Sequence, residues 1–191
     1  NGFKEEEKRA FTDYKSNDSE FIKKLAFLSY QSEVYQVRMY SVFLFGYLSE
    51  DKNILMFLRD EVSKDSNWRV QEVLAKSFDE FCKIIGYEKA LPVIDDWLKN
   101  SNHNTRRAVT EGLRIWTGRP YFKANPNEAI RRLAALRDDP SEYVRKSVGN
   151  ALRDISKKYP ELIRVELSTW SLETKGIKQV YQLANKLLIK S

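Results

Sequence analysis

The chain has 191 residues, of which 42% are hydrophobic, 31% charged and 13% aromatic, a balance that indicates a folded globular protein and excludes a disordered one. Seven glycines and five prolines are too few for an all-β chain, and the longest apolar run, residues 40–48, is too short to span a bilayer. The single cysteine, Cys82, excludes an internal disulfide and, with no signal-peptide pattern, favours an intracellular, cytoplasmic protein.

Charge is unevenly distributed around the net value of +6. Residues 1–100 hold 15 basic and 18 acidic side chains, whereas residues 101–191 hold 18 basic and 9 acidic ones. A polyanion such as DNA is the natural partner of so basic a half. The alternative is that these charges only solvate exposed helix faces.

One pattern recurs along the chain: a polar turn, an apolar residue followed by a polar anchor, and then apolar residues at helical spacing. The anchors are Arg38, Gln71, Arg106, Arg145 and Lys178, separated by 33, 35, 39 and 33 residues. Such separations are typical of helix-pair repeats of the HEAT kind. Partner helices are expected between the anchors, over residues 20–30, 52–62, 90–98, 128–136 and 161–170.

Each copy predicts an amphipathic helix. In the second copy Val70 and Leu74 lie on the apolar stripe, and Cys82 is expected to be a core thiol. In the fourth, Asp139 is expected to cap the helix and Pro140 to occupy its first position. Because one helix pair cannot bury its apolar face alone, the repeats should stack. The sequence therefore predicts one domain, residues 1–191, an all-α, curved α-solenoid of about five HEAT-like repeats, at least 70% helical and without a sheet.

Stacked repeats place equivalent residues in columns on the concave face, which the second helix of each pair usually lines. Glu72, Arg107 and Lys146 share one such column by the anchor separations. Glu72 lies roughly 200° around its helix from the apolar stripe, and Trp68 lies one turn before it. Trp68 is either a packing residue or a flat ring that stacks on a base or sugar.

A basic tract follows on the third and fourth copies. Its density suits contact with DNA phosphates, which is independent of sequence and sensitive to salt. Glu111 and Asp154 lie inside the tract, where they either neutralise neighbours or take part in chemistry. His103, the only histidine, is expected in a loop or capping role. No metal-ligand spacing, glycine-rich phosphate loop or nucleophile elbow occurs, so neither metal nor cofactor is expected.

The residues of the third and fourth copies resemble a known family. The matching text is Thr110-Glu111-Gly112-Leu113-Arg114, then Arg119-Pro120, and then the long run from Asp138-Asp139-Pro140 to Asp154-Ile155-Ser156-Lys157. Upstream, Trp68-Arg69-Val70-Gln71-Glu72 matches a Trp-x-x-x-acid element. Residues 60–170 are similar in this way to the DNA alkylation-repair proteins, the AlkC/AlkD group of HEAT-like-repeat DNA glycosylases.

The resemblance implies removal of N-alkylated purines from duplex DNA by hydrolysis of the N-glycosidic bond. A carboxylate near the sugar would stabilise the developing positive charge, and an aromatic face would attract the cationic base. By match, Glu72 is the carboxylate and Trp68 one aromatic face, with Asp154 as the rival carboxylate. Where AlkD-like members carry a second Trp, this chain has Asn150, as in the AlkC-like pattern. The expected DNA-binding residues are Arg106, Arg107, Arg114, Arg145, Lys146, Asn150 and Arg153.

Three hypotheses follow. The first is a DNA glycosylase for alkylated purines, favoured by Trp68, Glu72 and Asp154. The second is a DNA-binding relative without glycosylase chemistry, favoured because residues 1–30 lack the aromatic-rich recognition helices of AlkD-like enzymes. The third is a protein-interaction scaffold, as many HEAT arrays are. The first two predict a monomer whose partner is duplex DNA, damaged in the case of the glycosylase.

Overall fold

The computed structural model describes residues 2–190 of the chain. Helices make up 75% of the chain, and the described residues contain no strand, so the all-α prediction is confirmed. The contacts divide the chain into two compact units, one ending at Pro92 and one beginning at Val93. Within residues 2–190 no helix is both long and apolar enough to cross a lipid bilayer.

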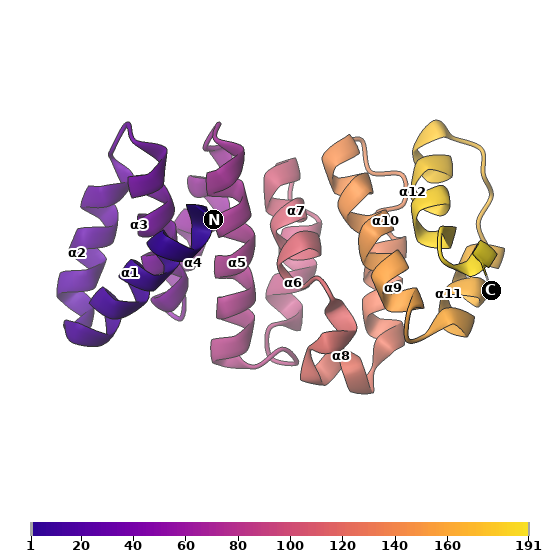
Figure 1. Cartoon of the computed structure of the whole chain (residues 1–191), viewed down its shortest axis with the longest axis horizontal. Helices are drawn as coiled ribbons and strands as arrows, with labels where there is room; N and C mark the ends of the chain where they lie inside the picture. Colours follow the sequence, from indigo (N-terminus) through magenta and orange to yellow (C-terminus); the bar gives the residue numbers. More distant parts are fainter. Residues whose placement is uncertain (1, 191) are drawn as a thin grey trace. The chain divides into compact units, whose positions relative to one another are not determined.

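Unit 1 is organised around α3. This helix packs against α1, α2 and α5, and its last turns contribute Phe45 to the buried core (Figure 1). Gly46 allows α3 and α5 to approach closely, because a Cβ atom at that position would lie 2.8 Å from Oγ of Ser77. The elements of unit 1 are α1 (Gly2–Ser16), α2 (Ser19–Tyr30), α3 (Tyr35–Tyr47), α4 (Lys52–Asp60), the 3-10 helix η1 (Val62–Lys64) and α5 (Trp68–Ile85).

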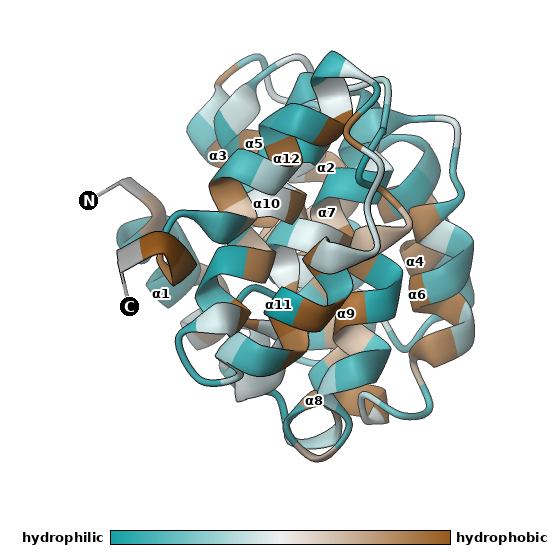
Figure 2. Cartoon of the chain, turned by 90° about the vertical axis from the view of Figure 1, so that its right-hand side faces the viewer, coloured by the Kyte–Doolittle hydropathy of each residue, from teal (hydrophilic) through white to brown (hydrophobic). Residues whose placement is uncertain are grey.

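Unit 2 is organised around α10, which packs against α7 on one side and α12 on the other. Bands of hydrophobic and hydrophilic residues alternate along its partner helices α9 and α11 (Figure 2), and Trp97 and Trp116 are fully buried in the core. The elements of unit 2 are α6 (Leu91–Leu98), α7 (His103–Gly112), η2 (Trp116–Gly118), α8 (Pro120–Ala124), α9 (Pro126–Ala134), α10 (Glu142–Ser156), α11 (Pro160–Ser168), α12 (Lys175–Asn185) and η3 (Leu188–Lys190). The first two residues of α6 belong to unit 1.

The expected repeats correspond to observed helices. Every polar anchor lies on a helix, namely α3, α5, α7, α10 and α12, and each expected partner helix is present to within two residues. Asp51 caps α4, and prolines occupy the first positions of α9 and α11. Cys82 is a buried free thiol, as expected. The repeat pattern does not predict the short helices η2 and α8.

Four of the five anchors donate to carbonyls of the loop that precedes their helix, an arrangement that we call the anchor ladder: Arg38, Gln71, Arg106 and Arg145. Arg106 donates from Nη1 to the carbonyls of Asn100 and Ser101 in the preceding loop, at 2.8 and 2.9 Å. Its Nε and Nη2 donate to the carboxylate of Asp139 in the loop before α10, each at 2.7 Å. This rung therefore joins α7 to the loop that begins the next repeat.

Arg38 repeats this geometry in unit 1. It donates to the carbonyls of Ser32 and Glu33 and, at 2.7 and 3.3 Å, to the carboxylate of Asp65. Gln71 holds only its own loop, through the carbonyls of Val62 and Asp65, because its amide is shorter than a guanidinium.

The ladder explains why one predicted cap is wrong. Asp139 does not occupy the capping position of α10, which belongs to Ser141, and the helix begins at Glu142 rather than at Pro140. The carboxylate of Asp139 instead accepts from Arg106 and from the backbone N–H of Ser141, at 2.9 Å. Asp65 organises its turn in the same way through Asn67 N–H, at 2.8 Å.

Candidate nucleic-acid interface

Two of the arginines expected to bind DNA belong to the anchor ladder. Arg106 is only 8% exposed and its guanidinium is held by two carbonyls and by Asp139. The prediction that it lines an open groove is therefore wrong. Arg145 is half-buried, donates to the carbonyls of Asp139 and Pro140, and reaches Oε1 of Gln179 at 2.9 Å. Both guanidiniums stabilise the stack of repeats in unit 2.

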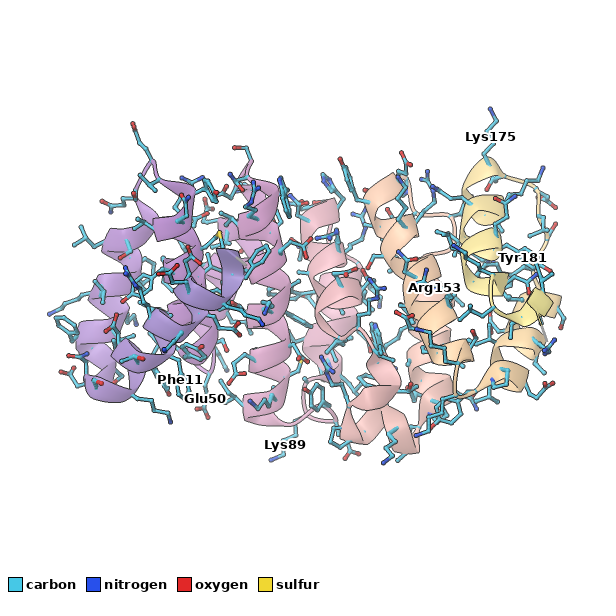
Figure 3. All side chains as sticks on the ribbon, in the orientation of Figure 1. Phe11, Glu50, Lys89, Arg153, Lys175 and Tyr181 are labelled. Carbon is cyan, nitrogen blue, oxygen red and sulfur yellow. The ribbon has the colours of Figure 1, made fainter. Side chains whose placement is uncertain are left out.

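The remaining cations of the tract lie along a different stripe of the same helices. On α10 the side chains of Lys146, Asn150, Arg153 and Lys157 recur every three or four residues, whereas the positions between them are mostly buried. On α7 Arg107 lies next to the buried Arg106 and is more exposed. Arg153 is labelled on α10 in Figure 3. We call this set, with Arg114 after α7, the basic stripe: Arg107, Arg114, Lys146, Asn150, Arg153 and Lys157.

Acidic partners restrain part of the stripe. Lys146 is exposed and pairs with Glu142 one turn earlier, at 2.7 Å, an arrangement that contributes little stability and is easily exchanged for a phosphate. Glu111 accepts from Nη1 of Arg114 at 3.1 Å and from Oγ of Ser147 at 2.8 Å. These contacts tie the stripe on α10 to the end of α7.

Asp154 is enclosed by three cations. Its carboxylate is 5% exposed and lies 2.8 Å from Nε of Arg114, 3.0 Å from Nζ of Lys157 and 3.4 Å from Nη2 of Arg153. Burial alone would raise the pKa of this carboxyl, but the hydrogen bonds from Arg114 and Lys157 outweigh it, and the pKa is lowered. Asp154 is therefore an anion whose oxygens face side chains of the protein itself.

The other candidate carboxylate lies in unit 1, at the start of α5. Trp68 is the first residue of this helix and 58% exposed, as expected for its predicted face. The guanidinium of Arg69 lies 4.4 Å from the ring centre of Trp68 and 5.3 Å from that of Tyr35. The ring of Phe3, from α1, makes an edge-to-face contact with Trp68, with 6.4 Å between the ring centres. The indole is thus exposed but already in contact with a cation and a ring.

Helix α1 crosses the face of α5 that carries Glu72. Phe3 contacts Trp68 one turn before Glu72, and Glu7 pairs with Lys76 one turn after it, at 3.3 Å. Glu72 is half-buried between these two contacts. Glu72 therefore lies away from the apolar stripe, as expected, but not on an open face, because α1 packs on α3 and reaches α5 through these two contacts. The repeat pattern gave no signal for this, since α1 has no counterpart among the five copies.

His103 is the first residue of α7, and its neighbour Asn102 provides the cap. The column joining Glu72 to Arg107 spans both units and stays a prediction, as do the DNA-contacting roles of the stripe residues.

Comparison with known proteins agrees with the resemblance seen in the sequence. The family described as "DNA alkylation repair enzyme" matches residues 4–169. The crystal structure of AlkD2 from Streptococcus mutans is 77% identical with a TM-score of 0.97, over 97% of this chain and 90% of that one. The alkylpurine DNA glycosylase AlkC of Pseudomonas fluorescens, solved on DNA containing an abasic site analog, shares the fold at 23% identity and a TM-score of 0.57, over 99% of this chain and 62% of that one.

Among curated proteins, the uncharacterized protein YhaZ of Bacillus subtilis is 36% identical over 91 residues. That match covers 46% of this chain and only 26% of YhaZ.

Proposed function

Because the chain belongs to the DNA alkylation repair enzyme family, we propose that it binds duplex DNA through the basic stripe of unit 2. The observation that carries the proposal is the division of labour between adjacent residues of α7 and α10. The guanidiniums of Arg106 and Arg145 are hydrogen-bonded within the anchor ladder. Arg107 and Lys146, one residue further on, lie on the more exposed stripe.

Further support comes from charge. The stripe holds five cations, and the carboxylates of Glu111, Glu142 and Asp154 contact four of them, Arg114, Lys146, Arg153 and Lys157. Clustered Lys and Arg side chains of this kind attract the phosphates of a nucleic acid. AlkC, which shares the fold, was solved on DNA.

The test is a salt titration of duplex binding, measured by fluorescence anisotropy. The double variant Arg107→Gln/Lys146→Gln should lower the slope of log affinity against log salt by about 0.9 for each phosphate that the variant no longer neutralises. The matched control is Arg131→Gln/Arg164→Gln, which removes two exposed cations from α9 and α11, each paired with an acid three residues earlier. Absence of any duplex affinity at low salt, or an equal decrease in the control, would overturn the proposal.

Excision of N-alkylated purines is the second candidate, favoured by the exposed Trp68 with Glu72 one turn along α5. In this hypothesis Glu72 stabilises the positive charge that develops on the sugar as the glycosidic bond breaks. In this hypothesis α1 must move for a lesion to reach Glu72, because Phe3 contacts Trp68 and Glu7 pairs with Lys76, one turn before and one turn after Glu72. Asp154 is the weaker candidate, since its oxygens are held by three cations.

Release of methylated purine from alkylated duplex DNA, followed by chromatography, tests this second candidate. Glu72→Gln should reduce release about a hundredfold or more, because it removes the charge and keeps the shape. The double variant Phe3→Ala/Glu7→Gln should increase release if α1 restricts access. No release by the wild type from any alkylated duplex would end the enzyme hypothesis and leave DNA binding standing.

A further inference from the structure

The cluster around Asp154 contains more cations than a structural ion pair requires. One buried carboxylate is satisfied by one well-placed guanidinium with its hydrogen bonds. Here Arg114 from the end of α7 and Arg153 and Lys157 from α10 all converge on the same carboxylate. With Glu111, which shares Arg114, the cluster has three positive and two negative charges. The cluster therefore keeps a net positive charge, and its three basic side chains are already held close together by Asp154.

The three cations contact a buried carboxylate and remain partly exposed to solvent. The side chains of Arg114, Arg153 and Lys157 are 30%, 22% and 58% exposed, whereas that of Asp154 beneath them is 5% exposed. Long basic side chains lose much rotamer freedom when they bind a ligand, and a side chain that is fixed beforehand has less to lose. Asp154 thus restricts the rotamers of the three cations before a second anion, of about the size of a carboxylate, binds to their exposed side.

Asp154 itself is fixed by the fold. It lies on the same turn of α10 as the fully buried Leu152 and Ile155. The network continues from Arg114 through Glu111 and Ser147 to Thr110, whose Oγ1 donates to Oγ of Ser147 at 2.8 Å. Two helices therefore share one hydrogen-bonded network that ends in the exposed cations.

We propose that Asp154 is a positioning residue that gathers Arg114, Arg153 and Lys157 into a single site for one phosphate group of the DNA backbone. The inference rests on the proposed DNA-binding function and gives Asp154 a role in affinity, not in bond cleavage. A neighbouring cation provides the matched control. Lys158 is exposed and lies over the ring of Tyr159, 5.6 Å from its centre, and not on Asp154.

The first test compares two adjacent lysines. Lys157→Gln and Lys158→Gln remove the same charge from consecutive residues at the end of α10. The positioned site predicts that Lys157→Gln weakens duplex binding roughly tenfold and lowers the salt slope by about 0.9, the value for one phosphate, whereas Lys158→Gln changes both only slightly. Equal effects in the two variants would mean a diffuse basic surface and would overturn the proposal.

The second test uses the sign of the effect of Asp154→Asn. Simple electrostatics predicts tighter DNA binding, because an anion near phosphates is removed. Positioning predicts roughly tenfold weaker binding, because three side chains lose their common support. In a double-mutant cycle Lys157→Gln should then cost less in the Asp154→Asn background than in the wild type. Tighter binding by Asp154→Asn, or additive effects of the two substitutions, would refute the role.

The outcomes separate the two proposals. A wild type without salt-dependent duplex affinity overturns both, whereas a wild type that binds while Asp154→Asn binds more tightly overturns only the positioning role. Circular dichroism and thermal unfolding test whether Asp154→Asn is folded. If this variant is unfolded, the comparison of Lys157→Gln with Lys158→Gln decides between the outcomes, since both lysines are exposed.

Discussion

Arg106 and Arg107 are adjacent arginines for which we predict opposite consequences. Arg106→Met should destabilise the protein and leave the DNA-contacting stripe chemically intact. Arg107→Met should weaken duplex binding and cost less stability than Arg106→Met, because Arg107 is the more exposed of the two. The two variants remove the same charge and add the same side chain, so they differ only in the position of the guanidinium on α7.

The magnitude for Arg106 follows from its contacts. The side chains of Arg106 and Asp139 are 10% and 3% exposed and share two hydrogen bonds of 2.7 Å. Removing one partner of such a buried pair costs about 3–5 kcal/mol, because the other charge is left uncompensated. Two loop carbonyls lose their donor as well, whereas the bond from Ser141 N–H to Asp139 remains. We therefore expect a decrease of about 3–5 kcal/mol in the free energy of unfolding.

Urea unfolding followed by circular dichroism measures the stability, and anisotropy at fixed salt measures the duplex affinity of the folded variants. The double variant Arg106→Met/Asp139→Asn should recover part of the stability, because it removes the unpaired charge. An Arg106→Met protein that is destabilised by less than about 1 kcal/mol, the range of an exposed ion pair, and binds DNA more weakly than Arg107→Met would refute the ladder as the role of Arg106.

Two further predictions concern packing and pH. Gly149→Ala should cost about 1–3 kcal/mol in thermal unfolding, because the new Cβ would lie 2.6 Å from Cβ of Leu183 on α12. Equal melting temperatures for Gly149→Ala and the wild type would contradict the close approach of α10 and α12. The pKa of Asp154 is lowered in the folded protein, so the stability advantage of the wild type over Asp154→Asn should be present at neutral pH and disappear as the pH falls below about 4, through the folded pKa. A difference in stability that stays constant down to about pH 2 would exclude the ionised carboxylate as its source.

The repeats could be predicted from the sequence because each copy encodes the same local structure. The recurrence of an apolar residue followed by a polar anchor located the second helix of every pair, and the apolar spacing located the core. These signals act over a few residues and do not depend on distant packing. Local capping signals are less reliable, since Asp139 and Pro140 are expected to begin α10, which begins at Glu142 after Ser141.

The prediction for Arg106 is wrong because a basic residue in a basic segment is naturally assigned to the surface. The signal that it belongs to the ladder is present in the pattern itself. A polar residue that recurs at the same position of successive repeats indicates a structural role that those repeats share, which here is the hold on the preceding loop. The aspartates that complete the rungs, Asp65 and Asp139, also precede their helices by the same distance, three residues.

The position of α1 could not be predicted from periodicity. Its contacts with α3 and α5 include Phe3 on Trp68, Glu7 on Lys76 and Tyr14 on Tyr47, which follow no repeat. Likewise, the gathering of three cations on Asp154 depends on the turn after α7, which brings Arg114 to α10. Both features are tertiary, and both change the interpretation of a candidate carboxylate.

The anchor ladder has a consequence for how such a chain can diverge. In the three middle repeats the residue after the anchor is Glu72, Arg107 or Lys146, so this more exposed position carries a different chemistry in each, while the anchor beside it bonds the preceding loop. Selection on the fold and selection on the ligand therefore act on neighbouring codons and rarely on the same one. A library that randomises only these positions should keep the backbone and sample new polyanion or protein targets. Two proteins of this architecture can accordingly be nearly superimposable and still have little in common in what they bind.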